Sequence, residues 1–235
     1  MGISDTFADF VSLTRQLKTL DICSISPLER KAFMINIYNS LTIHALVKGV
    51  LADPSSSTSR LKFYASASYI IGGLVFSLND IENGILRGNK PSPVPLSSEP
   101  FKSRELEKLN LCIELDPRIH FALNCGAKGC PPIGVYTADN LDSQLDRATR
   151  GYLNETVVDS SKNTIHIPML FKWYRSDFGN SDDEMISWIQ RHASQEMSAE
   201  IQKNRDTNTA SPRVEYLAYD WNLPSKPNKK KQNKK

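Results

Sequence analysis

The sequence of 235 residues has few cysteines and no long apolar run, and its formal net charge is only +3. Its clearest apolar segment, residues 70–76, contains two glycines and is far shorter than the roughly 18 residues that a membrane-spanning helix needs. The first residues include Asp5 and Asp9 but no basic cluster, which excludes the usual form of a secretory signal. The four cysteines therefore indicate reduced thiols in a cytoplasmic protein and not a disulfide framework.

Basic residues are concentrated at the end of the sequence. Residues 226–235 contain six of the 29 lysines and arginines and no acidic residue, so acidic residues outnumber basic ones in the rest. Because a nucleic-acid-binding domain carries its basic surface in its folded part, we expect no nucleic-acid binding by residues 1–225. The tail of residues 226–235 is expected to be disordered. Peripheral membrane contact would come from this tail, with lipidation of Gly2 as a second signal, although the same first residues could simply open a helix.

Apolar spacing and turn residues predict a mixture of helices and short strands. Ser26-Pro27-Leu28-Glu29 is a capping box that marks the start of a long helix, and Gly72-Gly73 suits the turn of a hairpin. The expected elements are helices over residues 6–20, 27–49, 141–152 and 181–195, a short helix capped by Ser77 and Asp80, hairpins over residues 69–76 and 156–167, and strands over residues 111–115, 118–124 and 214–219. We expect a single globular α+β domain over residues 1–225, with a buried central helix, short hairpins and a mixed or antiparallel sheet.

The predicted helix from Pro27 is apolar on almost every face, which indicates burial. Asn36 and Asn39 nevertheless lie within it, and a buried amide without a partner costs about 1–3 kcal/mol. These two residues therefore either fix the helix within the core or form the wall of a binding site.

Residues 118–132 contain the clearest candidates for chemistry. If they begin as a strand, His120 and Asn124 share one face, and Cys125 follows at a glycine-containing turn whose N–H groups could bind an anion. A thiol becomes a good nucleophile when a neighbouring base or cation lowers its pKa, and histidine is the usual partner. The sequence thus offers Cys125 as nucleophile and His120 as base.

Other interpretations of the same cysteines remain open. Free cysteines are often small buried hydrophobic residues. His120, Cys125, Cys130 and Cys112 have the atoms of a zinc site but not the usual ligand spacing, so we expect no metal and no cofactor. Cys125 and Cys130 could also form a redox pair, although their spacing differs from that of a thioredoxin motif.

Two carboxylates could orient the histidine. Glu82 lies on the predicted short helix, where the alternative is a solvent-exposed pair with Arg87. Asp177 ends an aromatic block, where the alternative is a turn or helix cap.

Five blocks of the sequence resemble the family known as domain of unknown function 547 (DUF547). They are residues 31–43, 71–87, 118–133, 170–179 and 219–221. Two residues depart from the family's pattern, since Met34 stands where members often have Trp and Gly129 where Ser is usual. Members of the family occur fused to other modules, including glutaredoxin-like and helical signalling domains, which suits an enzyme or a regulatory module equally.

The order of a buried helix, a histidine and a later aspartate is also similar to the papain and transglutaminase superfamily. In this sequence the buried helix contains Asn36 and Asn39 but no cysteine, so that superfamily's nucleophile has no counterpart there. Our leading hypothesis is a thiol-dependent hydrolase or transferase, active or degenerate, acting on an unknown protein or small molecule. The alternative is a non-catalytic interaction or regulatory module, as in signalling or redox-linked proteins.

Overall fold

The structure is a computed structural model that describes residues 5–224. The tail of residues 226–235 and the lipidation pattern at Gly2 lie outside the described residues. The main helices are α1 (Asp5–Gln16), α2 (Pro27–Val47), α3 (Ser57–Ser66), α4 (Leu106–Leu109), α5 (Leu141–Leu153), α6 (Leu170–Trp173), α7 (Arg175–Phe178), α8 (Asp182–His192) and α9 (Gln195–Thr207). The helical segments of other types are η1 (Leu17–Thr19), η2 (Asp80–Leu86), η3 (Pro117–Phe121) and η4 (Ala138–Asn140), of which η2 is a π-helix and the others are 3-10 helices. The strands are β1 (Ser68–Ile71), β2 (Leu74–Ser77), β3 (Val157–Asp159), β4 (Thr164–Ile167) and β5 (Arg213–Tyr216).

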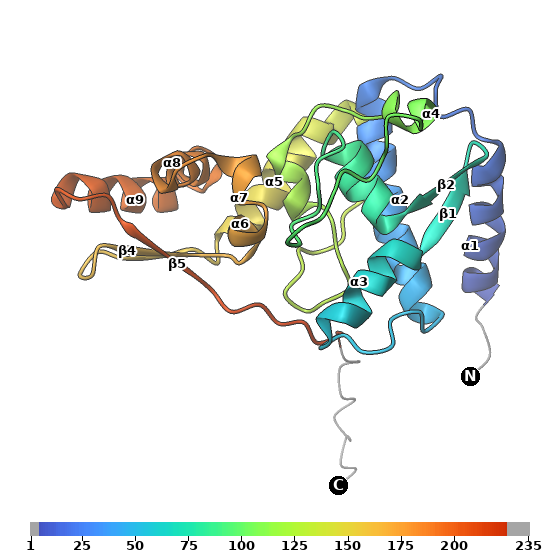
Figure 1. Cartoon of the computed structure of the whole chain (residues 1–235). Coiled ribbons are helices and arrows are strands. Elements are labelled where there is room, and N and C mark those ends of the chain that lie inside the picture. Colours follow the sequence, from blue (N-terminus) through green and yellow to red (C-terminus); the bar gives the residue numbers. More distant parts are fainter. Residues whose placement is uncertain (1–4, 225–235) are drawn as a thin grey trace, which may run out of the picture.

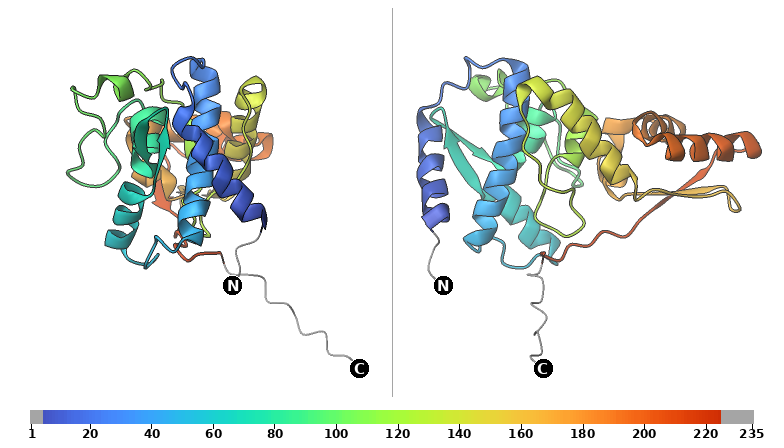
Figure 2. Two further views of the ribbon diagram at one scale, coloured as in Figure 1. Left: turned by 90° about the vertical axis from the view of Figure 1, so that its right-hand side faces the viewer. Right: turned by 180° about the vertical axis from the view of Figure 1, so that it is seen from behind.

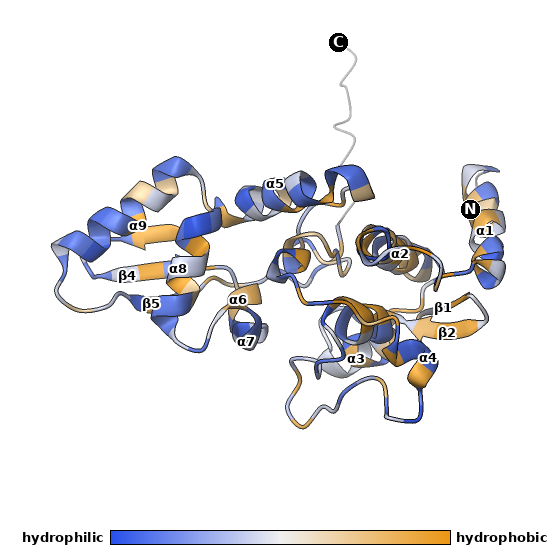
Figure 3. Cartoon of the chain, turned by 90° about the horizontal axis from the view of Figure 1, so that it is seen from above, coloured by the Kyte–Doolittle hydropathy of each residue, from blue (hydrophilic) through white to orange (hydrophobic). Residues whose placement is uncertain are grey.

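Helix α2 is the buried central helix that the sequence predicts. It begins with the expected capping box, in which Ser26 and Glu29 bond each other's backbone N–H groups. Met34, Ile35 and Tyr38 are almost fully buried. Figure 3 shows α2 among the most hydrophobic parts of the chain, whereas α9 is largely hydrophilic. Burial of its apolar side chains, at about 1.5–3 kcal/mol each, makes α2 the centre of the first hydrophobic core.

The strands form two small sheets, as an α+β fold with short hairpins requires. Strands β1 and β2 pair antiparallel across the Gly72-Gly73 turn, where both glycines have positive φ. Strand β4 pairs antiparallel with β3 and parallel with β5. The second sheet is therefore mixed, and the predicted fold class is confirmed.

Two of the predicted strands are wrong. Residues 111–115 have no strand partner, and residues 117–121 form the short helix η3. The cause is local, because Asp116 accepts a hydrogen bond from the N–H of Arg118 and Pro117 occupies the first helical position. His120 therefore lies on a turn of helix and not on a strand.

Two hydrophobic cores meet at η3. Ile119 packs into the first core around α2, and Phe121 packs into the second core around α8. Figures 1 and 2 show the corresponding arrangement, with α8, α9, β4 and β5 extending away from the part that holds α1, α2 and α3. His120 lies between Ile119 and Phe121, so its backbone is fixed from both sides.

The chain after β5 returns to the first part of the molecule. Figure 1 shows this segment running from β5 back toward α3. Trp221 packs against Trp173, and the guanidinium of Arg60 on α3 lies 3.8 Å from the centre of its indole ring. We call residues 217–224 the C-terminal strap. Within residues 5–224, no helix is long and apolar enough to cross a membrane.

Candidate functional site

The loop that carries Cys125 and Cys130 is held against α2. The side chain of Asn39 donates to the carbonyl of Ala122 at 2.9 Å and accepts from the N–H of Asn124 at 2.8 Å. Asn124 in turn donates to the carbonyl of Pro131 at 2.7 Å. These hydrogen bonds hold the two ends of the loop close together without any contribution from the cysteine side chains.

Glycine at position 126 allows this loop to lie close to α2. Gly126 has a φ of +93°, and a Cβ there would be 2.5 Å from Cδ1 of Leu46. A larger residue would be strained by its backbone and would clash with the helix. The turn therefore brings the two cysteines back toward each other.

The sulfur atoms of Cys125 and Cys130 are 2.6 Å apart, and both cysteines are free and partly exposed. The hydroxyl of Tyr219, on the C-terminal strap, lies 3.3 Å from Cys125 Sγ and 3.0 Å from Cys130 Sγ. The N–H of Cys125 also donates to Cys130 Sγ at 3.1 Å.

These contacts favour one thiolate in the pair. The hydrogen bond from Cys130 is the main reason that the pKa of Cys125 falls to about 7, with further contributions from the hydroxyls of Tyr219 and Tyr64. The same hydrogen bond, together with burial, raises the pKa of Cys130 well above its usual range. Near neutral pH the pair can share one proton, with the negative charge on Cys125.

The C-terminal strap is held on the cysteine loop by its backbone as well. Lys128 and Gly129 donate their N–H groups to the carbonyls of Asn222 and Asp220 at 2.8 and 3.0 Å. A Cβ at position 129 would lie 3.0 Å from the ring of Tyr219, so glycine permits this close approach. Gly129 therefore lies where the C-terminal strap packs directly against the cysteine loop.

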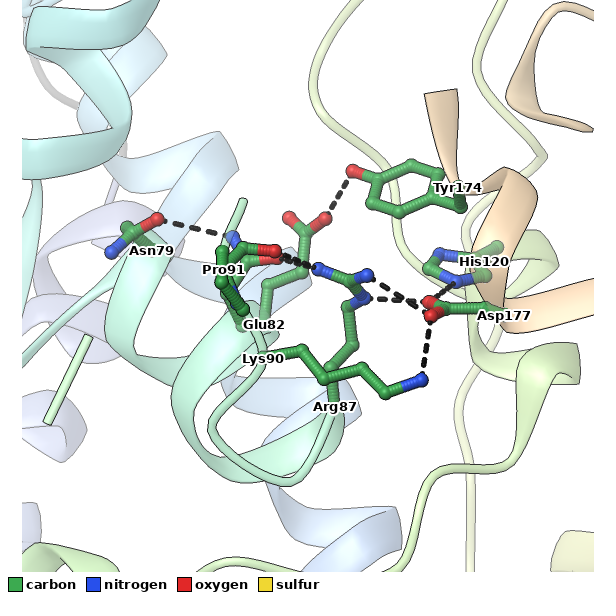
Figure 4. Close-up of polar contacts among 9 residues, drawn as sticks. Asn79, Glu82, Arg87, Lys90, Pro91, His120, Tyr174 and Asp177 are labelled. Atoms are coloured by element: carbon green, nitrogen blue, oxygen red, sulfur yellow. Dashed lines mark hydrogen bonds and ion pairs between the residues drawn. The ribbon is translucent and has the colours of Figure 1, made fainter. Parts of the chain in front are cut away.

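His120 and Asp177 form a second cluster, shown in Figure 4. His120 Nε2 lies 2.9 Å from Asp177, which also accepts from Nε of Arg87 at 2.7 Å and from Lys90 at 3.0 Å. The ring of His120 stacks on Tyr174 with 3.9 Å between the ring centres.

Burial and charge set the protonation states of this cluster. Burial raises the pKa of Asp177, but hydrogen bonds from His120 and Arg87 outweigh it and hold the pKa well below its usual range. Burial lowers the pKa of His120, and the negative charge of Asp177 only partly opposes this. A neutral His120 therefore donates from Nε2 to an ionised Asp177 near neutral pH.

Glu82 is buried between two tyrosines. Tyr38 on α2 donates to one of its oxygens at 2.8 Å, and Tyr174 donates to the other. The sequence alternative for Glu82, a solvent-exposed pair with Arg87, is wrong, because Arg87 is buried and pairs with Asp177 instead. The cap or turn suggested for Asp177 is likewise replaced by this buried ion pair.

Tyr64 connects the cysteines with the carboxylate cluster. Burial raises its pKa well above the usual range, and the charges of Cys125 and Glu82 raise it further. The pKa of Tyr38 is raised for the same reasons, by burial and then by Glu82. Hydrogen bonds and ring stacking link Tyr38, Glu82 and Tyr174 to the ring of His120.

The predicted site residues thus divide into two groups. Asp177 contacts His120, and Cys130 contacts Cys125, but within residues 5–224 no hydrogen bond joins His120 to either sulfur. The amide of Asn36 bonds both the N–H and the carbonyl of Tyr136, as Asn39 does for the cysteine loop. The ligand-binding role predicted for these two asparagines stays a prediction.

Sequence reasoning missed the tyrosines and the arginine of the site. In the sequence, Tyr38 looks like another apolar residue of a buried helix, and Tyr219 is predicted to be part of a strand. The sequence indicates Arg87 only as an exposed partner of Glu82. In the described residues no group of three or more histidine, cysteine or acidic side chains is arranged to hold a metal ion.

Comparison with known proteins identifies a family but no characterised relative. No curated protein and no solved structure matches the chain. The family described as "Protein of unknown function, DUF547" matches residues 23–153, which is more than half of the chain. This range contains α2, the buried Glu82 and Arg87, His120 and the cysteine loop, while Asp177 and Tyr219 lie beyond it. The chain belongs to the DUF547 family.

Proposed function

We propose that this protein is a thiol-dependent enzyme that exchanges disulfides, with Cys125 as the nucleophile and Cys130 as the resolving thiol. The observation that carries the proposal is the distance of 2.6 Å between the two sulfurs, with the Tyr219 hydroxyl in contact with both. A lone activated cysteine would suit acyl transfer equally well. A second thiol at this distance favours disulfide chemistry, because it can displace whatever the first thiol has captured.

The reaction proceeds in two balanced steps. The Cys125 thiolate attacks one sulfur of a substrate disulfide, and the other substrate sulfur leaves as a thiolate that takes a proton from water. Cys130 then attacks Cys125 Sγ, which breaks the mixed disulfide, and the proton of Cys130 passes to the second substrate sulfur, which leaves as a thiol. The substrate disulfide is reduced to two thiols by two electrons, and the protein gains a disulfide between residues 125 and 130.

Activation of Cys125 in this proposal comes from its hydrogen bonds and not from His120. The groups that favour the thiolate are the Cys130 thiol, the Tyr219 hydroxyl, the backbone N–H of Ala127 and the Tyr64 hydroxyl. We propose that His120 and Glu82 act at a distance by fixing Tyr174 and Tyr38, with Asp177 orienting the imidazole. The base role of His120 stays a prediction.

A non-catalytic regulatory module is the second candidate. The observation that favours it is the complete pairing of the buried cluster around Asp177, in which His120, Arg87 and Lys90 all bond one carboxylate. A fully paired cluster of this kind is enough to fix the fold and needs no catalytic role. The reactivity of the cysteines distinguishes the two candidates.

The test is the pH dependence of iodoacetamide alkylation, followed for each cysteine by mass spectrometry. The proposal expects Cys125 to react at neutral pH with the rate of a thiolate whose pKa is about 7. Exposed Cys23 is the internal control for an ordinary thiol. Cys130→Ala should raise the pKa of Cys125 by removing its main donor. If Cys125 never reacts faster than Cys23 over the pH range, the proposed disulfide exchange is wrong and the regulatory module is favoured.

A further inference from the structure

A pocket of about 440 Å³ opens beside Cys130. One wall is the chain from Cys130 to Tyr136, and the other is one face of α5 and the residues that follow it. Cys130 lines the pocket, and the sulfur of Cys125 lies 2.6 Å from that of Cys130. The pocket therefore leads from solvent to the cysteine pair.

The floor of the pocket is kept open by small residues on α5. Ala148 and Gly151 both line it, and a Cβ at Gly151 would meet no atom within 4 Å. Glycine inside a helix is less stable than alanine, so its presence here is unfavourable for the helix itself. The open space lies along the helix face, one turn beyond Arg147.

The pocket carries one positive and one negative side chain that lack partners. Arg147 and Glu155 both line the pocket and are exposed, and within residues 5–224 neither side chain has an ion pair or a hydrogen bond with the protein. Gln144 on the same helix differs, because it is held by the N–H of Thr137 and the carbonyl of Val135. Partial burial raises the pKa of Glu155. A ligand that carries both a carboxylate and an ammonium group can pair with both side chains.

We propose that this pocket binds a small zwitterionic disulfide of the amino-acid type, with a carboxylate on Arg147, an ammonium group on Glu155 and its sulfurs at the Cys130 end. This inference rests on the proposed function and gives it a substrate class. The ligand is the oxidant of the two-step exchange described above, so no other reagent is needed. The apolar wall of Pro132, Ile133 and Val135 would cover the short carbon chain of such a molecule.

The first experiment measures formation of the disulfide between residues 125 and 130 in the reduced full-length protein. The reagents are L-cystine, which is zwitterionic, and bis(2-hydroxyethyl) disulfide, which is neutral. The ratio of the two rates is compared between variants, so that the intrinsic reactivity of each reagent cancels. Cystamine and 3,3′-dithiodipropionate, each charged with one sign, extend the comparison.

Arg147→Gln and Glu155→Gln should each lower the ratio of the rate with L-cystine to the rate with bis(2-hydroxyethyl) disulfide about threefold, as expected for an exposed ion pair. Arg147→Gln should affect dithiodipropionate but not cystamine, and Glu155→Gln the reverse. Arg150→Gln is the matched control, because Arg150 is an exposed residue of α5 that does not line the pocket. Equal ratios in the wild type and both pocket variants would overturn the binding site while leaving the proposed function intact.

A second experiment tests the site without chemistry. Saturation-transfer NMR detects L-cystine bound to the Cys125→Ser/Cys130→Ser protein. The signal should fall when Arg147→Gln is introduced into the same protein. Absence of any signal with the unmodified pocket overturns the inference. If instead even the neutral disulfide fails to oxidise the reduced protein, the exchange reaction is wrong, and the NMR result alone decides whether the pocket binds the ligand.

Discussion

The hydroxyl of Tyr219 lies 3.0 Å from the sulfur of Cys130, a residue 89 positions earlier in the chain. Tyr219 lies outside the part of the sequence that matches the family. It reaches the cysteine loop because the C-terminal strap returns from β5 and bonds Lys128 and Gly129. The electrostatic environment of the thiols therefore depends on a segment that the family match does not include.

Tyr219→Phe is expected to slow alkylation of Cys125 at neutral pH. A hydrogen bond to a charged group contributes about 1.5–3 kcal/mol, so its loss should raise the pKa of the Cys125 thiol by about one unit or more. The phenyl ring keeps the packing against Trp173 and Trp221. The measurement is the pH profile of iodoacetamide labelling, with Tyr216→Phe as a control outside the site. An unchanged Cys125 profile would show that the tyrosine only packs.

Two glycine substitutions should change stability in opposite directions. Gly126→Ala is expected to lower the free energy of unfolding by roughly 1–3 kcal/mol, because its φ is +93° and the new Cβ meets Leu46. Gly151→Ala should raise it by about 0.5–1 kcal/mol, because the position is helical and open. Urea denaturation measures both. A destabilising Gly151→Ala would mean that the space above α5 is already filled.

Much of the fold follows from local sequence signals. The capping box at Ser26, the Gly72-Gly73 turn and the apolar spacing around Leu145 each define an element that the structure contains. Helix α9 escaped prediction because its sequence is largely polar and only Ile201 and Asn204 are buried. The strand predicted over residues 118–124 is wrong because Ile119 and Phe121 are apolar for another reason: each packs into a different core. Apolar residues at every second position look the same in a sequence whether they lie on a strand or between two cores.

The residues of the candidate site could be predicted from the sequence only in part, again because tertiary contacts decide the outcome. Cys125, Cys130, His120 and Asp177 are chemically distinctive residue types, and the sequence alone singles them out. Which of them meet is decided by tertiary contacts: η3 turns His120 toward Asp177, and the glycine turn brings Cys130 back to Cys125. Tyrosines carry no such signal, since a buried tyrosine looks like any other core aromatic.

Truncation should separate the strap from the tail. A chain ending at Ser225 is expected to keep the melting temperature of the full protein, because the contacts described for the strap end at Asn222. A chain ending at Arg213 loses most of β5 and the strap, and should melt at a lower temperature. Calorimetry tests this, and the Ser225 chain should also lose any affinity for anionic vesicles. Equal melting of the Arg213 chain would place the end of the folded unit before β5.

Acid should destabilise the protein in two stages that belong to His120 and Asp177. The pKa of His120 is below its usual value of 6.5, so below that pH the unfolded chain binds a proton that the native protein resists, and stability falls as pH falls. The pKa of Asp177 is below its usual 3.8, so its contribution is present at higher pH and is lost only as pH drops below that value.

The first stage can be isolated with one substitution. His120→Gln should flatten the decrease in unfolding free energy between about pH 7 and pH 5.5, by about 1.4 kcal/mol for each unit by which the pKa of His120 is lowered. His166→Gln, on β4 and partly exposed, is the matched comparison, because His166 lies outside the cluster around Asp177. Asp177→Asn should instead lower stability at every pH above 4 by about 3–5 kcal/mol, because it leaves the buried Arg87 without its counter-charge. Urea unfolding across this pH range measures all three, and a His120→Gln slope equal to that of the wild type would assign the first stage to another group.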